Sequence, residues 1–470
     1  MDPDQFQLQQ MQFGSGLAAT VLNPAVLILV FIAGLMICFA GRRKVLAPFL
    51  VLAIMIPTDQ VFVLGSFHFP MLRILALFAL GRLFWAKLSA NEAIFSGGMN
   101  GIDKSVVVLN VFTTVDGVLL WRQAGMLFNQ VGTMCTLFGV YFLLRFLIQD
   151  EEDVRRTLRV LGWVTIVVAV IMIGEQATGK NVLYATRGGA RASMSIMERD
   201  DHLRANGPFA HPNLAGTFGG IVLPLFFGLW WKEARDRKFA AVAIAAAIVI
   251  SFAASSSTAL GGLIGGIVGL CFWPLHRQMR LLRWSIVVAL VSLHLYMKSP
   301  VWHLISDIDL TGGSSSYHRF MLVDQCIRHF WDWILVGTKS FGTWGWDMWD
   351  LSDQYVATAD TAGLIPLISL LAMLVFGFKY LGRALRASEG DRKQEWFIWA
   401  LGASLFANLV AFFGISYFDQ TIVAWYALLA MISGVTLSAR NSGKVQQTEP
   451  EIAKSDISFQ SRLAQSSIQS

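Results

Sequence analysis

The residues best suited to chemistry in this chain lie in one polar stretch. Residues 198–220 read ERDDHLRANGPFAHPNLAGTFGG, and the sequence turns apolar from Asn213 onward. An apolar run that begins at an asparagine predicts a helix with Asn213 as its N-cap. The free amides and the positive dipole end of that helix would face Arg204 and His211. An arginine, a histidine and a helix N-terminus together suit an anionic group such as a phosphate.

Each of these side chains also has a purely structural interpretation. Arg204 can hold a phosphate through two N–H groups, but it can instead pair with Asp200 or Asp201 in a loop folded over the helix. His211 is a candidate proton acceptor or hydrogen-bond donor, and its alternative is a structural role beside the helix start.

A run of hydroxyls forms a second candidate contact surface. Residues 255–258 read SSST and join two apolar runs, at the level expected for Arg204. Ser255 and Ser257, together with Asn213, are therefore possible sugar or phosphate contacts. Alternatively, the serines only cap the next helix. For the glycines at 261–266 we expect a packing role, because they let helices approach closely.

The acidic residues offer a proton acceptor. Asp353 precedes an apolar run, and a partly desolvated carboxylate can take a proton from a hydroxyl. A solvated loop acid or a helix cap is the alternative. Asp116 is a weaker candidate, as a charge inside a predicted spanning helix. Asp307 and Asp309 resemble a metal-binding pair, but two residues are a weak signal, and we predict no metal site.

The segment before Asp353 predicts a surface structure. Residues 321–333 show an amphipathic helical pattern, and three tryptophans follow at 344, 346 and 349. The tryptophans suit a belt at a membrane interface, or platforms that stack on sugars.

The composition excludes an ordinary soluble protein. Hydrophobic residues make up 55% of the 470 and charged residues only 14%, whereas soluble domains carry about a quarter charged residues. The net charge of +6 does not indicate nucleic-acid binding, because Lys and Arg collect on the cytoplasmic loops of membrane proteins. The four cysteines imply no disulfide framework.

The apolar runs predict an all-α, polytopic membrane protein with about 12–14 transmembrane helices and two long extracytoplasmic loops. The predicted helices are 24–40, 45–57, 72–88, 105–121, 128–147, 158–174, 213–231, 239–254, 260–275, 284–297, 362–380, 396–413 and 421–437. The run 45–57 is short enough to be re-entrant.

Basic residues crowd every second connection, which places those connections in the cytoplasm and the N-terminus outside. Basic residues in the two long outer loops break this pattern, and a bound anion would explain them. The predicted organisation is an extracytoplasmic N-terminal segment (1–23), N-terminal transmembrane helices (24–174), a first extracytoplasmic loop (175–212), central transmembrane helices (213–297), a large extracytoplasmic loop (298–361), C-terminal transmembrane helices (362–438) and a disordered cytoplasmic tail (439–470).

The order of these motifs resembles the O-antigen ligase and Wzy-type polysaccharide polymerase superfamily, over about residues 204–376. There an arginine, Gly-x-Phe and Pro-Asn lead into a helix, as residues 204–213 do here. Residues 255–257 look like the family's Ser-x-Ser turn, Arg319 like its large-loop arginine, and residues 352–364 like its last loop segment. Ligases usually have an arginine where Thr258 stands and a histidine near Asp353. The absence of that histidine favours a polymerase.

The resemblance implies a GT-C-like glycosyltransferase of the inner (cytoplasmic) membrane. It would transfer a glycan from undecaprenyl diphosphate at the outer face, polymerising repeat units of an exopolysaccharide or O-antigen. Arg204 and Arg319 would bind the diphosphate, and Asp353 or His211 would take the acceptor proton.

No metal or other cofactor is implied, and nucleic acid is not an expected partner. The expected partners are the lipid-linked glycan, membrane lipid, and chain-length regulator and export proteins. An O-antigen ligase and a protein O-glycosyltransferase are alternatives within the class, and a glycan flippase or transporter is the alternative outside it.

Overall fold

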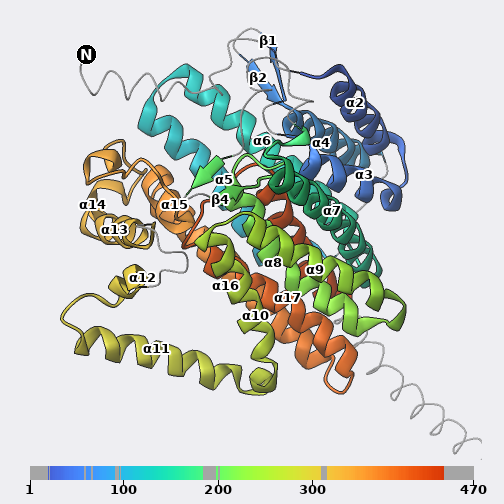
Figure 1. The fold of residues 1–470 in the computed structure, drawn as a ribbon. Helices are drawn as coiled ribbons and strands as arrows, with labels where there is room; N and C mark the ends of the chain where they lie inside the picture. The colour runs from blue at the N-terminus through green and yellow to red at the C-terminus, as the bar shows by residue number, and fades with distance from the viewer. Residues whose placement is uncertain are drawn as a thin grey trace, which may run out of the picture.

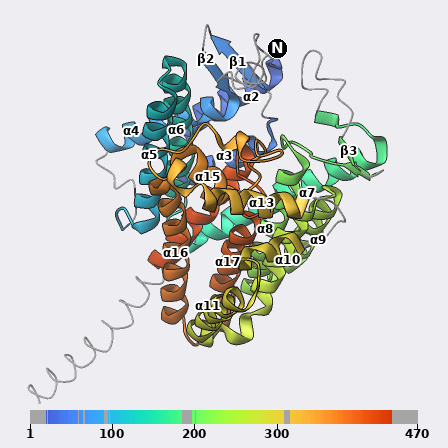
Figure 2. The same ribbon diagram turned by 90° about the vertical axis from the view of Figure 1, so that its left-hand side faces the viewer.

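The computed structural model shows a helical bundle (Figures 1 and 2). It describes residue 20 and residues 22–438, except for 58–59, 65–66, 90–94, 96, 184–196, 200–201 and 308–314. All thirteen predicted runs are helices. Their bounds are α2 Pro24–Phe39, α3 Arg42–Met55, α4 Met71–Ser89, α5 Gly101–Trp121, α6 Ala124–Leu147, α7 Glu151–Thr178, α8 Pro212–Lys232, α9 Arg237–Ala253, α10 Ser257–Cys271, α11 Met279–Tyr296, α16 Leu364–Ala387, α17 Arg392–Ala411 and a last helix, Gln420–Ser438.

Seven of the described helices are long and apolar enough to cross a membrane. They are α5, α6, α7, α8, the segment Trp273–Tyr296 that contains α11, α16 and the helix Gln420–Ser438. The apolar helices α2 and α10 are shorter. These helices make the chain a multi-pass membrane protein. The predicted 12–14 spans exceed this number, since α3 and α9 are short and α4 carries three basic residues.

Helix α8 lies at the centre of the bundle, packed against α9, α10 and α17 (Figure 1). Its glycines permit this close approach. A Cβ atom at Gly219 would lie 2.6 Å from the Ala247 carbonyl oxygen in α9, and one at Gly220 would lie 2.6 Å from the Leu263 nitrogen in α10. Gly266 of α10 also packs closely against α8, because its Cβ atom would lie 2.9 Å from Cγ of Pro224. The packing role predicted for the glycines of α10 is confirmed at this position.

Ion pairs join the connections at one end of the bundle. They link the starts of α3 and α7, the end of α8, the short 3-10 helix η3 (Ala234–Asp236) and the α10–α11 and α16–α17 connections. The pairs are Arg42–Asp153, Lys232–Glu151, Arg159–Asp236 and Arg277–Glu389. The basic connections that the sequence placed on one side therefore gather at a single end, which we call the ion-pair end.

The segment 298–361 was predicted as a loop, and its described residues, 298–307 and 315–361, form short helices at the opposite end of the bundle (Figure 2). The elements are η5 Val301–His303, α12 Leu304–Asp307, α13 Ser315–Arg328, α14 Phe330–Trp333, η6 Phe341–Thr343 and α15 Gln354–Ala362. They bury their own small core, which includes Leu322, Cys326 and Trp333. The predicted amphipathic helix at 321–333 is present, but it starts earlier and breaks at His329.

The described strands form two short antiparallel hairpins. Strands β1 (Val61–Leu64) and β2 (Phe67–Pro70) follow α3, and β3 (Met197–Arg199) pairs with β4 (His202–Arg204) in the first predicted outer loop. Helix α11 stands apart from the bundle, with no residue buried. Residues 1–19 and 21 of the predicted N-terminal segment 1–23, and the predicted tail 439–470, lie outside the described residues.

Candidate functional site

Arg204 ends strand β4 and is almost completely buried. Its Nε donates a hydrogen bond to the Ala254 carbonyl oxygen at 3.3 Å, and its Nη2 donates to Oδ1 of Asn213. The guanidinium is thus fixed between the start of α8 and the end of α9. The alternative partners, Asp200 and Asp201, lie outside the described residues.

The loop that carries Arg204 is organised by a residue that the sequence did not single out. Glu175, fully buried near the end of α7, accepts hydrogen bonds from the backbone N–H groups of Asn206 at 2.8 Å and Gly207 at 3.0 Å. Gly207 has a φ of +58°, a conformation that favours glycine. An acid at the end of a long apolar run was the available signal for this role, since a buried carboxylate needs donors.

His211, not Asn213, caps helix α8. The Nδ1 atom of His211 accepts a hydrogen bond from the Asn213 backbone N–H at 3.1 Å, and Pro212 occupies the first helical position. The predicted N-cap was wrong because proline is preferred at that first position, which moves the cap one residue earlier. Burial, reinforced by the charge of Arg204, lowers the pKa of His211 to about 4. His211 is therefore neutral at pH 7 and a poor proton acceptor.

A segment of five residues, 254–258, contacts both arginines; it comprises the connection after α9 and the first two residues of α10, and we call it the 254–258 turn. Arg204 binds the carbonyl of Ala254, and Nη2 of Arg319 donates to Oγ1 of Thr258 at 2.6 Å. Thr258 in turn donates to the Gly414 carbonyl at 3.1 Å. Ser255 in the same turn adopts a positive φ of 45°. Two arginines from distant parts of the sequence thus contact one short turn.

Ser255 and Ser257, the predicted sugar or phosphate contacts, lie in this turn. Ser257 is buried at the start of α10 and Ser255 is partly exposed. Ser256 occupies the cap position of α10 but makes no side-chain cap hydrogen bond. The side chain of Ser256 therefore does not cap α10.

Asp353 caps helix α15 with a buried carboxylate. Its Oδ1 accepts hydrogen bonds from the N–H groups of Tyr355 at 2.8 Å and Val356 at 2.9 Å, and the residue is 1% exposed. Burial raises the pKa of Asp353 to about 7, although both N–H groups and the charge of Arg319 lower it. Asp353 therefore has a structural role and, at the same time, the pKa of a group that exchanges protons near neutral pH.

These groups lie far from the ion-pair end. Arg204 and His211 contact the first turn of α8, whereas Lys232 at its last turn belongs to the ion-pair end. A helix of 21 residues is about 30 Å long, which equals the thickness of the apolar core of a bilayer. Two guanidinium groups, a neutral imidazole and a titratable carboxylate therefore collect at one end of the bundle.

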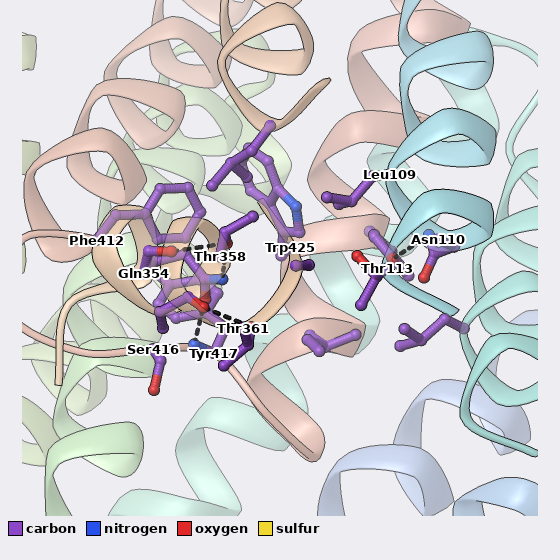
Figure 3. Close-up of a pocket in the computed structure, with 16 residues that line it drawn as sticks. Leu109, Asn110, Thr113, Gln354, Thr358, Thr361, Phe412, Ser416, Tyr417 and Trp425 are labelled. Atoms are coloured by element: carbon purple, nitrogen blue, oxygen red, sulfur yellow. Dashed lines mark hydrogen bonds between the residues drawn. The ribbon is translucent and has the colours of Figure 1, made fainter. Parts of the chain in front are cut away.

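A cavity of about 290 Å³ adjoins this site (Figure 3). Residues of α5 and α6 line one side, and residues of α15, α16, the loop after α17 and the last helix line the other. Gln354 forms part of the wall and directly follows Asp353. Its backbone N–H donates to the Phe412 carbonyl at 2.7 Å, and its Oε1 accepts from the Tyr417 N–H at 2.6 Å. The cavity wall is thereby fixed to the start of α15.

Other candidate residues lie elsewhere. Asp116 is buried in α5, and its Oδ2 makes no hydrogen bond within the described part of the chain. Asp307 ends α12 on the surface, whereas Asp309 lies outside the described residues. Of the three tryptophans, Trp344 stacks on His329 with ring centroids 4.4 Å apart, Trp349 packs edge-on against Phe341, and Trp346 is 82% exposed. Trp346 is the one free to serve an interface or a sugar.

Comparison with known proteins does not identify a family. No family profile matches the chain, and no curated protein matches it. The resemblance to the O-antigen ligase and polymerase superfamily therefore remains a prediction from short motifs.

Proposed function

We propose that the chain is a metal-independent membrane glycosyltransferase that uses an undecaprenyl-diphosphate-linked glycan as donor. It polymerises repeat units of an exopolysaccharide or O-antigen at the outer face of the cytoplasmic membrane. The observation that carries the proposal is the contact of Arg204 and Arg319 with the same turn, residues 254–258. Two guanidinium groups that contact one segment of five residues suit the two phosphates of a diphosphate.

The membrane orientation follows from charge. The ion-pair end holds most of the basic connections and would face the cytoplasm. Arg204, Arg319 and Asp353 would then lie at the outer face, where a lipid-linked donor can enter sideways from the membrane. A buried arginine kept on the outer side, against the usual distribution of basic residues, is explained by a bound anion.

In the proposed reaction, the acceptor hydroxyl attacks the anomeric carbon of the donor sugar. The bond from that carbon to the diphosphate oxygen breaks, and the new glycosidic bond forms. Arg204 and Arg319 stabilise the negative charge that develops on the leaving diphosphate. Cleavage of the glycosyl diphosphate drives the reaction, so the step requires no nucleotide.

The acceptor proton goes to Asp353 in this scheme. Its pKa of about 7 is suited to a general base, and because the carboxylate is 1% exposed, the transfer requires an intervening group or a local opening at the start of α15. His211 is neutral and its Nδ1 already accepts a backbone hydrogen bond, which leaves Nε2–H as a donor. We therefore assign the base role to Asp353 and a donor role toward the diphosphate to His211.

Mass analysis of the lipid-linked glycans in cells that carry variant chains tests the proposal. With Arg319→Ala, we expect single repeat units to accumulate on undecaprenyl diphosphate while the protein stays in the membrane. Arg328→Ala is the matched control, because Arg328 lies on the same helix, is exposed and pairs with Asp324. Normal polymer from Arg319→Ala would refute the proposal. Accumulated full-length chains on lipid would instead indicate a ligase.

A further inference from the structure

The cavity beside Asp353 has the chemistry of a site for a neutral ligand. None of the 16 residues that line it is charged. An ion would lose its hydration shell there without gaining a counter-charge. A pure hydrocarbon would leave the polar wall unpaired. An uncharged molecule with many hydrogen-bonding groups is the remaining class.

Several polar groups of the wall have unused hydrogen-bonding capacity. Trp425 is 4% exposed, and its indole N–H makes no hydrogen bond with the described residues. Figure 3 shows the indole nitrogen turned toward the space between α5 and α15. The hydroxyls of Thr113 and Ser416 also make no hydrogen bond with described residues. An indole N–H that faces the cavity and has no partner among the described residues can take an acceptor from a ligand or water.

Asn110 adds a side-chain amide to the wall of the cavity. Its Nδ2 donates to the Val106 carbonyl at 2.8 Å and more weakly to the Tyr426 hydroxyl at 3.4 Å. The amide is thereby held in one orientation, and its Oδ1 is left to accept. Asn110 and Trp425 thus line one cavity from two helices, as Figure 3 shows for the labelled residues.

The size and shape of the cavity limit the ligand. About 290 Å³ corresponds to roughly ten water molecules and lies near the lower bound for small-molecule pockets. Phe412 and Tyr417 add aromatic surface to that of Trp425. A single pyranose ring matches these features, because it has C–H groups that pack on aromatic rings and hydroxyls that both donate and accept.

We propose that this cavity binds the neutral sugar ring that carries the acceptor hydroxyl. The proposal rests on the glycosyl-transfer function proposed above, and it places the acceptor in the cavity because Gln354 of the wall adjoins Asp353, the assigned base. Gln354 donates hydrogen bonds to Phe412 and Thr358 and accepts one from the Tyr417 N–H, and these bonds keep this wall in place without a ligand. A preformed wall favours binding because little ordering entropy is lost.

Saturation-transfer NMR on the full-length chain tests this inference, in a detergent without a sugar headgroup. The probes are glucose, galactose, mannose and N-acetylglucosamine, with glucuronate as the charged comparison. We expect at least one neutral sugar to bind and glucuronate to bind less well. Trp425→Phe and Thr113→Val should each weaken that binding about three- to tenfold, since each removes one hydrogen-bonding group.

Two controls make the outcome decisive. Ser369→Ala, in α16 and outside the cavity, removes a hydroxyl that bonds only its own helix and should leave sugar binding unchanged. Arg319→Ala should also leave it unchanged, although it abolishes transfer, so sugar binding and diphosphate chemistry are tested separately. Thr113 makes no hydrogen bond with the described residues, so Thr113→Val is not expected to unfold the chain. Unchanged sugar binding in both cavity variants, or binding of glucuronate alone, would overturn the inference.

Discussion

Replacing Asp353 with asparagine separates the structural role of this residue from its chemical role. Asparagine is as good an N-cap as aspartate, so the hydrogen bonds from Tyr355 and Val356 are kept. The substitution removes the buried negative charge and the proton acceptor together. We therefore predict a chain that is more stable than the wild type above pH 7 and inactive in transfer.

The magnitude follows from the pKa. The carboxyl titrates at about 7 in the folded chain and has a reference value of 3.8. The folded state binds the Asp353 proton more tightly than the unfolded state does. The stability that this proton contributes is complete below about pH 3.8 and is lost as the pH rises through 7. The stability lost over the whole pH range amounts to about 4 kcal/mol. About 3 kcal/mol of this is lost as the pH rises from 5 to 8.

Thermal unfolding of the purified chain at pH 5 and pH 8 measures this effect. Asp353→Asn should raise the unfolding temperature at pH 8 by several degrees more than at pH 5. Asp391→Asn is the matched control, because Asp391 caps α17 through the N–H groups of Lys393 and Gln394 but is exposed. The reasoning fails if Asp353→Asn is less stable at pH 8, or if its effect is the same at both values. Retained transfer activity would remove Asp353 as the base.

Three further outcomes follow from the packing and the caps. Gly220→Ala should destabilise the chain by about 1–3 kcal/mol in thermal unfolding, because the new Cβ would lie 2.6 Å from the Leu263 backbone nitrogen. Gly261→Ala is the control and should not destabilise the chain, because the space around Gly261 is open. His211→Ala should cost about 1 kcal/mol through the lost cap, and His211→Asn should restore it. Because the pKa of His211 is about 4, the pH–rate profile of the His211→Asn variant should keep the wild-type limb near pH 7.

The helices could be predicted from the sequence because each apolar run carries its own signal. The runs 24–40 and 128–147 correspond closely to α2 and α6. The large outer segment could not be predicted in the same way, because its helices are short and amphipathic, and they are stabilised by the core of Leu322, Cys326 and Trp333 rather than by length.

The candidate site was predictable in its residue types but not in its connections. Arg204, Arg319 and Asp353 stand out as charges in predicted outer segments of an apolar chain. That Arg204 and Arg319 contact one turn depends on how α9 and α10 pack, and no local pattern encodes it. The cavity could not be predicted from the sequence either, because its uncharged lining comes from helices that are distant in the chain.

The central claim is that Arg204 and Arg319 together bind a diphosphate. Binding of undecaprenyl diphosphate to the purified full-length chain tests it directly, with Arg204→Ala, Arg319→Ala, the double variant and Arg328→Ala as control. We predict that each single variant loses affinity at least tenfold, that the double variant loses less than the two combined, and that Arg328→Ala binds normally. Wild-type affinity in either single variant, with its folding intact, would contradict the account.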